Sequence, residues 1–391
     1  SPSKCLKIEK YLGFQYKCIA SKGHLREITK VMSAKHNYNP IFNIISEKLS
    51  HVEWMKSIVA QFEPKHIFIG TDDDREGEGI AWHICEVCNL DILTTHRILF
   101  HEITESALKY AVKNPICIRM NIVKAQQARQ ILDRMIGFKI SPILSRLLVH
   151  DNSKFLSAGR CQTPTLRLIY DRHQEYAHKK SCVQYKIAGS FFRHPSILST
   201  TLDTYLNTET EVKDFLNKSK NYSHILTIED RKQKTSTAPK PFNTSNLLQT
   251  SSSILHISPK HTMDICQKLY QDGKITYMRT ESKKYAQAFV QLLNTYITNS
   301  YDECYIGNNE QITNFDNQNP HEAIRVTNLN ASITDYSDKK TNDVYRLIWK
   351  RTVESAMKEY EYQESPIQIS APVSSYKSSV QVPIFLGWKR V

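Results

Sequence analysis

The chain has 391 residues, of which 40% are hydrophobic and 23% are charged. This composition excludes a collagen-like or wholly disordered protein, and the length predicts roughly two to four domains rather than one small binding module. Fifty-two Lys and Arg against 39 Asp and Glu give a net charge of +13, which favours a polyanionic partner such as nucleic acid.

Several sequence signals are missing. No apolar run approaches the ~20 residues that cross a bilayer, and no charged-then-apolar leader opens the chain, so we expect no membrane association and a cytoplasmic or nuclear location. The nine Cys are scattered, and the CxxC of Cys85 and Cys88 lacks a second pair that would complete a zinc site. The sequence contains no GxxxxGK[ST] motif, so nothing in it indicates use of ATP.

The first hundred residues predict alternating helices and strands. An amphipathic stretch from the start of the chain to Gly13 predicts a helix with a glycine C-cap. A strand is predicted over Tyr16 to Ala20, a helix over Val52 to Phe62, and a short buried strand over His66 to Gly70. This alternation favours a mostly parallel sheet.

An acidic run, Thr71 to Glu78, follows the predicted buried strand and precedes a further amphipathic helix. The carboxyl end of a strand, where this run lies, is where ligands bind in open α/β sheets. Capping of the helix explains one or two of the carboxylates. Alternation along the chain would aim Asp72 and Asp74 to one side, where their oxygens could hold Mg²⁺. We expect a metal site, with capping as the alternative.

A second candidate site lies two hundred residues later, in the segment Gln271 to Ser282. Tyr277 stands two residues before Arg279 and is flanked by Thr276 and Thr280. One interpretation is a strand with an outward Tyr–Arg pair. The other is a phenolic nucleophile for a phosphodiester, with a guanidinium that takes up charge on the phosphoryl oxygens.

These motifs occur in the order found in type IA DNA topoisomerases, particularly the bacterial topoisomerase I branch. The string TDDDREGEGIAWH resembles the acidic motif TDPDREGEAIAWH of that family's TOPRIM domain. Further matching blocks are FHEIT (100–104), AQQARQILDRMIGFKISPIL (125–144), LSAGRCQTPTLRLI (156–169), PFNTSNLLQ (241–249), ITYMRTES (275–282), HEAIRVT (321–327) and YRLIWKRTV (345–353).

The resemblance implies a role for each matching residue. Tyr277 would form a 5′-phosphotyrosine bond and release a 3′-hydroxyl, while Arg279 would stabilise the phosphate. Lys4 would lie by the scissile phosphate, and His321 would support the site. The residues implied to hold Mg²⁺ are Asp72, Asp74 and Glu76.

The same resemblance implies a groove for single-stranded DNA. The residues of the matching blocks that would hold the DNA backbone and a base are Arg129, Asp133, Arg134, Ser157, Arg160, Gln162 and Thr163. For Arg129 and Arg160 the alternative is a solvated basic helix face.

The implied activity is that of a monomeric DNA topoisomerase. It would relax negatively supercoiled DNA by Mg²⁺-dependent breakage, passage and rejoining of a single strand. Because transesterification exchanges one phosphodiester for another, this activity agrees with the missing ATP motif. The alternatives are an impaired fragment that only binds single-stranded DNA, a topoisomerase III-like decatenase and, more distantly, a TOPRIM primase or nuclease.

The chain departs from the family pattern in several places. The family has an acidic Glu directly before Ser-Pro, a position that would precede Ser1, so we expect the 391 residues to bind single strands without relaxing supercoiled DNA. Asp73 stands where the family motif has Pro. Other departures are Glu281 for Asp, Ala356 for Gln, and Gln130 and Phe138 for the Arg and Tyr of the branch that prefers cytosine, so we expect that base preference to be weakened.

Composition and resemblance together predict the fold class and the domains. We expect a multidomain α/β plus α protein, with the core architecture of a type IA topoisomerase truncated at both ends. The predicted domains are a Rossmann-like TOPRIM domain over 1–115, a helical DNA-groove domain over 116–181, a β-arch domain over 182–238, a helical domain with the active-site tyrosine over 239–362, and a return to the arch over 363–391. Within them, 231–241 is predicted to be a linker and 307–320 a polar loop.

Overall fold

The computed structural model describes residues 2–31, 38–148, 155–179, 182–193, 195–314 and 322–391. These residues form two compact units, each built from several stretches of the chain. The first unit contains 1–170, 241–287 and 313–352, and the second contains 171–240, 288–312 and 353–391. No helix among the described residues has the length and apolar character needed to span a membrane.

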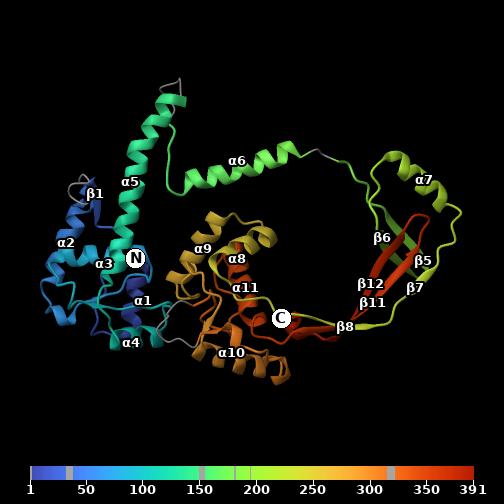
Figure 1. The fold of residues 1–391 in the computed structure, drawn as a ribbon. Coiled ribbons are helices and arrows are strands. Elements are labelled where there is room, and N and C mark those ends of the chain that lie inside the picture. Colours follow the sequence, from blue (N-terminus) through green and yellow to red (C-terminus); the bar gives the residue numbers. More distant parts are fainter. Residues whose placement is uncertain (1, 32–37, 149–154, 180–181, 194, 315–321) are drawn as a thin grey trace. The chain divides into compact units, whose positions relative to one another are not determined.

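The N-terminal part of the first unit contains short strands and helices (Figure 1). Its elements are α1 (Pro2–Leu12), β1 (Arg26–Val31), β2 (Pro40–Ile44), α2 (Leu49–Val59), β3 (Phe68–Ile69), α3 (Arg75–Cys88), β4 (His96–Arg97) and α4 (Glu105–Lys113). The predicted first helix is confirmed, and Gly13 follows it with a φ of +96°, as expected of a glycine C-cap.

The strand pairing is only partly parallel, whereas the sequence favoured a mostly parallel sheet. β3 and β4 pair in parallel through Phe68↔His96 and Ile69↔Arg97, whereas β1 and β2 form an antiparallel pair. The strand predicted over Tyr16 to Ala20 is wrong, because this segment is not a strand. The N–H of Cys18 donates to the Glu9 carboxylate at 2.8 Å instead of entering a ladder.

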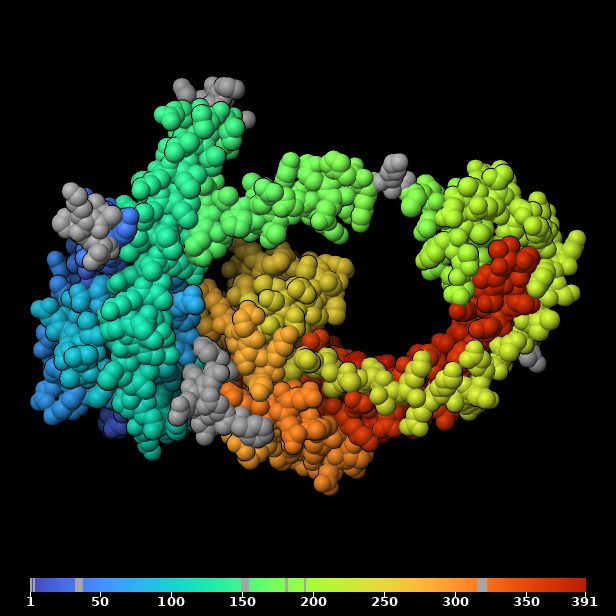
Figure 2. All heavy atoms as spheres, in the orientation of Figure 1, coloured from blue at the N-terminus to red at the C-terminus, as the bar shows by residue number. Residues whose placement is uncertain are grey.

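Helix α5 (Met120–Leu148) starts on the N-terminal part and extends beyond it (Figure 2). Its buried residues are Val123 and Gln126, both near its N-terminus. Val123 joins a core cluster with Ile69 and Ala81, so α5 and α3 pack together beside β3. The C-terminal half of α5 therefore stands outside this core.

The remainder of the first unit is mainly helical. Its helices are α8 (Thr244–Thr250), the adjoining π-helix η4 (Ser251–Leu255), α9 (Pro259–Gln271) and most of α11 (Lys339–Glu354). β9 (Tyr285–Ala286) pairs in parallel with β10 (Thr313–Asn314), and Ile275 forms an antiparallel bridge with Val326. Tyr277 shares one core cluster with Ile8 of α1 and Phe100. This cluster joins the tyrosine segment to the N-terminal part.

The second unit contains a sheet with strand order β5-β6-β12-β11-β7, with β8 also paired to β11. Its strands are β5 (Ala188–Arg193), β6 (Ser196–Leu202), β7 (Leu226–Ile228), β8 (Lys232–Ser236), β11 (Tyr360–Ser370) and β12 (Ser375–Phe385). β11 and β12 run through most of the segment 363–391, and the linker predicted over 231–241 is wrong over β8. The helices are α7 (Glu209–Ser219) and most of α10 (Gln287–Ser300), while α6 (Gln162–His178) is shared between the units.

Candidate active site

The acidic loop between β3 and α3 is shaped by local hydrogen bonds. Asp74 is the N-cap of α3, and its Oδ1 accepts from the N–H of Gly77 at 2.6 Å. A Cβ at Gly77 would lie 2.0 Å from the carbonyl oxygen of Asp72, so only glycine fits there. Capping, the alternative explanation of the acidic run, is thus correct for one oxygen of Asp74.

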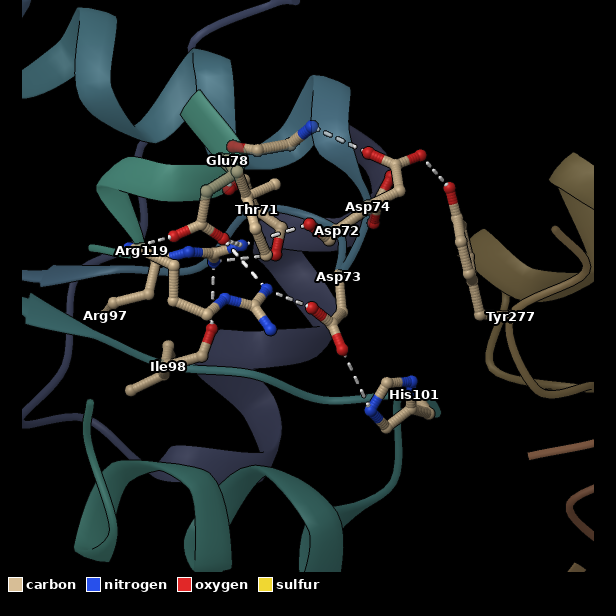
Figure 3. A network of polar contacts seen from close by, with 12 residues as sticks. Thr71, Asp72, Asp73, Asp74, Glu78, Arg97, Ile98, His101, Arg119 and Tyr277 are labelled. Carbon is tan, nitrogen blue, oxygen red and sulfur yellow. Dashed lines mark hydrogen bonds and ion pairs between the residues drawn. The ribbon is translucent and has the colours of Figure 1, made fainter. Parts of the chain in front are cut away.

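The other oxygen of Asp74 contacts the candidate nucleophile. The Tyr277 hydroxyl donates to Asp74 Oδ2 (Figure 3). The guanidinium of Arg279 lies 3.9 Å from the same oxygen. Tyr277 is 5% exposed, whereas the side chain of Arg279 is 56% exposed. The structure therefore brings Tyr277, Asp74 and Arg279 together, with the guanidinium open to solvent.

The surroundings of Tyr277 disfavour its ionised form. Burial raises the pKa of the Tyr277 hydroxyl well above its usual range, and the hydrogen bond and charge of Asp74 raise it further, with Asp72 adding to the effect. The positive charge of Arg279 acts in the opposite direction. An added cation beside the two carboxylates would lower this pKa for the same electrostatic reason.

Asp72 pairs with the N-terminal helix α1. Lys4 Nζ lies 2.5 Å from Asp72 Oδ1, and the Tyr270 hydroxyl donates to the same oxygen at 3.4 Å. Lys4 also lies over the Tyr270 ring, which meets the Tyr277 ring edge-on at a centroid distance of 5.2 Å. Tyr270 thus contacts Lys4, Asp72 and Tyr277, and it keeps the first two beside the third.

The three carboxylates predicted to hold a metal have different protein partners. Glu76 accepts from Gln126 of α5 at 3.0 Å and lies 3.5 Å from His24, away from the partners of Asp72 and Asp74. Over the part of the chain that the structure describes, no group of three or more His, Cys, Asp or Glu side chains is arranged to hold a metal ion. The carboxylate oxygens suit Mg²⁺ chemically, and in this structure Asp72 Oδ1 is engaged by Lys4 and Asp74 Oδ2 by Tyr277.

The remaining two carboxylates of the acidic run are buried against arginines. Glu78 is fully buried and pairs with Arg97 at 3.4 Å and with Arg119 at 2.9 Å. Asp73 pairs with Arg119 and lies 3.6 Å from His101 Nε2. These arginines were not predicted to belong to the site, because nothing in their local sequence distinguishes them from solvated basic residues.

A second buried ion cluster was also missed. The guanidinium of Arg325 contacts Glu322 at 2.7 and 3.0 Å and Glu102 at 2.9 Å. Both carboxylates stand in sequence blocks already singled out, FHEIT and HEAIR, but their pairing joins residues more than two hundred positions apart. The predicted His321, next to Glu322, lies outside the described residues.

The predicted DNA-groove residues fall on α5 and at the start of α6. Arg160 pairs with Asp133 at 3.1 Å, because the segment before α6 is hydrogen-bonded to Ser141 and Ser145 of α5. At the start of α6, the Gln162 side-chain amide donates to Ser157 Oγ at 2.9 Å, and Thr163 Oγ1 accepts from the N–H of Gly159 at 3.1 Å.

The two other predicted groove residues differ in availability. Arg134 donates to the carbonyl oxygens of Ile28 and Thr29 at 2.5 and 2.7 Å, so it holds the β1 strand. Arg129 is exposed on α5 and makes no side-chain hydrogen bond or ion pair to the described residues. Arg129 is therefore the more available of the two for a phosphate.

Comparison with known proteins points to one family. The chain matches the family model described as DNA topoisomerase over residues 117–391, and the model described as Toprim domain over residues 1–103. Among solved structures it is similar to full-length topoisomerase I from Thermotoga maritima, with 33% identity and a TM-score of 0.83. The match covers 100% of this chain and 66% of that one, so the chain spans about two thirds of the length of its relative.

Proposed function

The chain belongs to the type IA DNA topoisomerases of the bacterial type, and on this premise we propose that it breaks and rejoins single-stranded DNA through Tyr277. The single observation that carries the proposal is the Tyr277 hydroxyl on Asp74, with Arg279 beside the same carboxylate. A phenol, a proton acceptor and an exposed cation in contact are the groups that attack on a phosphodiester requires.

The proposed cleavage step conserves phosphodiester bonds. Tyr277 Oη attacks the phosphorus, a bond forms between them, and the bond from phosphorus to the 3′ oxygen breaks. The phenolic proton passes to Asp74, which already accepts that hydrogen bond, and the departing 3′ oxygen takes up a proton to become a hydroxyl. Rejoining reverses these transfers, so a strand can pass and be resealed without ATP, with relaxation of negative supercoils as the net result.

Lys4 and Arg279 provide the positive charge in this proposal. Lys4 is 12% exposed and is held on Asp72, whereas Arg279 is the more accessible cation. Both can turn from a carboxylate to the incoming phosphate, whose oxygens carry negative charge through the reaction. By family resemblance, we propose that His321 also supports this site.

We propose Asp72, Asp74 and Glu76 as the Mg²⁺ ligands of the rejoining reaction. The support is the chemistry of the donors, since Mg²⁺ prefers oxygen ligands, together with the two carboxylates that meet beside Tyr277. When bound, the ion would neutralise the acidic pair and the DNA phosphate. Lys4 and the Tyr277 hydroxyl would then exchange their carboxylate partners for the DNA.

We propose that the single strand lies along α5 and the start of α6. The exposed Arg129 and the half-exposed Arg160 would neutralise phosphates, and Asp133 would fix the direction of Arg160. The other proposed groove residues are Arg134, Ser157, Gln162 and Thr163. We also propose that the chain is divided into TOPRIM, groove, arch and tyrosine domains, as predicted. We propose in addition that it acts as a monomer.

Covalent capture tests this function. We would use the natural polypeptide that carries this sequence and a single-stranded oligonucleotide labelled at its 3′ end, which stays with the 5′ phosphate after cleavage. The expected result is a labelled protein adduct with the unsubstituted protein and none with Tyr277→Phe, while single-strand affinity changes less than about threefold.

Tyr270→Phe is the matched control, because Tyr270 is the other phenol beside the acidic pair. It should retain the adduct. An adduct that persists in Tyr277→Phe and disappears in Tyr270→Phe would move the nucleophile to Tyr270. Binding of the oligonucleotide without any adduct from the unsubstituted protein would favour a protein that only binds single strands.

A further inference from the structure

Asp73 is a buried carboxylate in the acidic loop, at the position where the resembling family motif has Pro. It is 4% exposed and points away from the Tyr277 hydroxyl, toward His101 (Figure 3). Its two oxygens face Arg119 and His101, respectively. Asp73 therefore belongs neither to the pair that meets Tyr277 nor to the proposed metal ligands.

Arg119 links Asp73 to the helix that carries the proposed DNA groove. Arg119 immediately precedes α5, and its guanidinium contacts both Asp73 and Glu78. Its backbone N–H also donates to Glu78 Oε1 at 2.7 Å. A buried ion pair of this kind holds its members in one geometry, because separating them would leave charge without a partner. The start of α5 is thus fixed to the acidic loop.

The same ion cluster is anchored to the backbone of the loop. Arg97, which pairs with Glu78, is fully buried and donates to the carbonyl oxygens of Thr71 at 2.9 Å and Asp72 at 3.0 Å. Two carboxylates and two guanidiniums therefore form a cluster without formal net charge, buried except at Arg119, whose side chain is 30% exposed. These hydrogen bonds fix the backbone of Thr71 and Asp72, directly before Asp73.

His101 connects Asp73 to the candidate nucleophile. The Tyr277 N–H donates to the carbonyl oxygen of His101 at 2.8 Å. The His101 side chain is 15% exposed and lines a small cavity together with Thr276, Tyr277 and Thr280. The Asp73 carboxylate thus lies 3.6 Å from the imidazole of the same residue whose carbonyl accepts from the Tyr277 N–H.

We propose that Asp73 is a positioning residue for Tyr277, joining the start of the groove helix α5 to the nucleophile through Arg119 and His101. The proposal rests on the proposed function, since it assigns Tyr277 the attack on DNA. The Asp73 carboxylate faces Arg119 and His101 rather than the hydroxyl of Tyr277 (Figure 3). Its effect is on where the reacting oxygen lies when a strand is bound along α5.

Asp73→Asn tests the proposal, because it keeps the shape of the side chain and removes the charge. We expect single-turnover cleavage of a bound oligonucleotide to slow by about tenfold or more, since a displacement of about 1 Å can cost 10²-fold in rate. The dissociation constant for the same oligonucleotide should change less than about threefold, because Arg129 and Arg160 are untouched. A structural defect alone would instead lower the fraction of active protein without slowing the rate.

His101→Ala is the second variant and remains informative if Asp73→Asn fails to fold. It removes the imidazole outside the buried ion cluster, and it should slow cleavage to a similar degree without a change in the melting temperature. In the double variant the two effects should not multiply, because both act on one connection. Glu86→Gln is the matched control, since Glu86 pairs with Arg26 elsewhere on α3 and should leave the cleavage rate unchanged.

Three outcomes would overturn the proposal. They are cleavage at the unsubstituted rate in folded Asp73→Asn, cleavage at that rate in His101→Ala, and multiplied effects in the double variant. These outcomes differ from a failure of the proposed function, in which the unsubstituted protein itself forms no Tyr277 adduct.

Discussion

Replacement of Arg325 by Met should destabilise the first unit strongly and in a pH-dependent way. Arg325 is 4% exposed, and its guanidinium bonds Glu322 at 2.7 and 3.0 Å and Glu102 at 2.9 Å. Removing one partner of a buried ion pair costs about 3–5 kcal/mol, because the other partner keeps its charge without compensation. We expect a loss of that size in the free energy of unfolding at pH 7.

The sign of the pH dependence follows from Glu322. Burial by itself would raise the pKa of Glu322, but the charge and hydrogen bonds of Arg325 outweigh burial and hold that pKa below its usual value. In the unsubstituted protein, Glu322 therefore adds stability above its unfolded pKa of about 4.3, and this stability is lost as the pH falls through the lower folded pKa.

In Arg325→Met the balance of effects on the pKa of Glu322 reverses. Burial then outweighs the remaining favourable contributions, a backbone hydrogen bond from Ala286 and the charge of His101, so the pKa of Glu322 rises above its usual value. Protonation on acidification now relieves the buried charge. The difference in stability between the variant and the unsubstituted protein should accordingly shrink from pH 7 to pH 5.

Urea unfolding followed by tryptophan fluorescence at pH 7 and pH 5 measures this difference. Arg325→Met/Glu322→Gln should recover part of the loss at pH 7, because it removes one of the stranded charges. Lys109→Ala, which breaks an exposed pair with Glu105, is the control and should cost less than about 1 kcal/mol. A loss below about 1 kcal/mol in Arg325→Met, or one of equal size at both pH values, would refute this reasoning.

Two further predictions concern the proposed metal and DNA sites. Asp72→Asn should impair Mg²⁺-dependent rejoining more than cleavage, so that the covalent adduct accumulates over a Mg²⁺ titration. Asp91→Asn is its control, because Asp91 accepts from the N–H of Leu93 in a turn away from the acidic run. Normal relaxation by Asp72→Asn at every Mg²⁺ concentration would contradict the metal assignment. Arg129→Ala and Arg160→Ala should each reduce the slope of log affinity for single-stranded DNA against log salt by about 0.7, the share of one neutralised phosphate. Lys109→Ala should leave the slope unchanged, and an unchanged slope in both arginine variants would place the strand elsewhere.

The part of the fold that was predicted depends on local sequence. Helix α3 was expected from its apolar face and its acidic start, and both features operate locally through burial and capping. Strand β8 was mistaken for a linker because Lys232 to Ser236 has no apolar alternation. It forms a strand by pairing with β11, a partner more than a hundred residues away. Local composition carries no signal for such a pairing.

The candidate site likewise combines residues that local sequence blocks predict with residues that only long-range contacts bring in. The resemblance singled out Tyr277 and Asp74, because each stands in a recognisable block, and the structure brings them into contact. Arg119 was not predicted to be part of the site. Its role depends on Asp73 and Glu78, which are 46 and 41 residues away. A buried charge cluster becomes visible only when the fold has brought its members together.

Helix capping, the alternative to a metal site for the acidic run, uses one oxygen of Asp74 and leaves the other for Tyr277. Oδ1 of Asp74 accepts from the Gly77 N–H and starts α3, while Oδ2 accepts from the Tyr277 hydroxyl. A carboxylate fixed through one oxygen loses the freedom to rotate, so the cap determines where the second oxygen points. Gly77 is required for this arrangement, because a side chain there would meet the Asp72 carbonyl at 2.0 Å. The local stability of α3 and the placement of the carboxylate oxygen that accepts from Tyr277 therefore depend on the same few atoms.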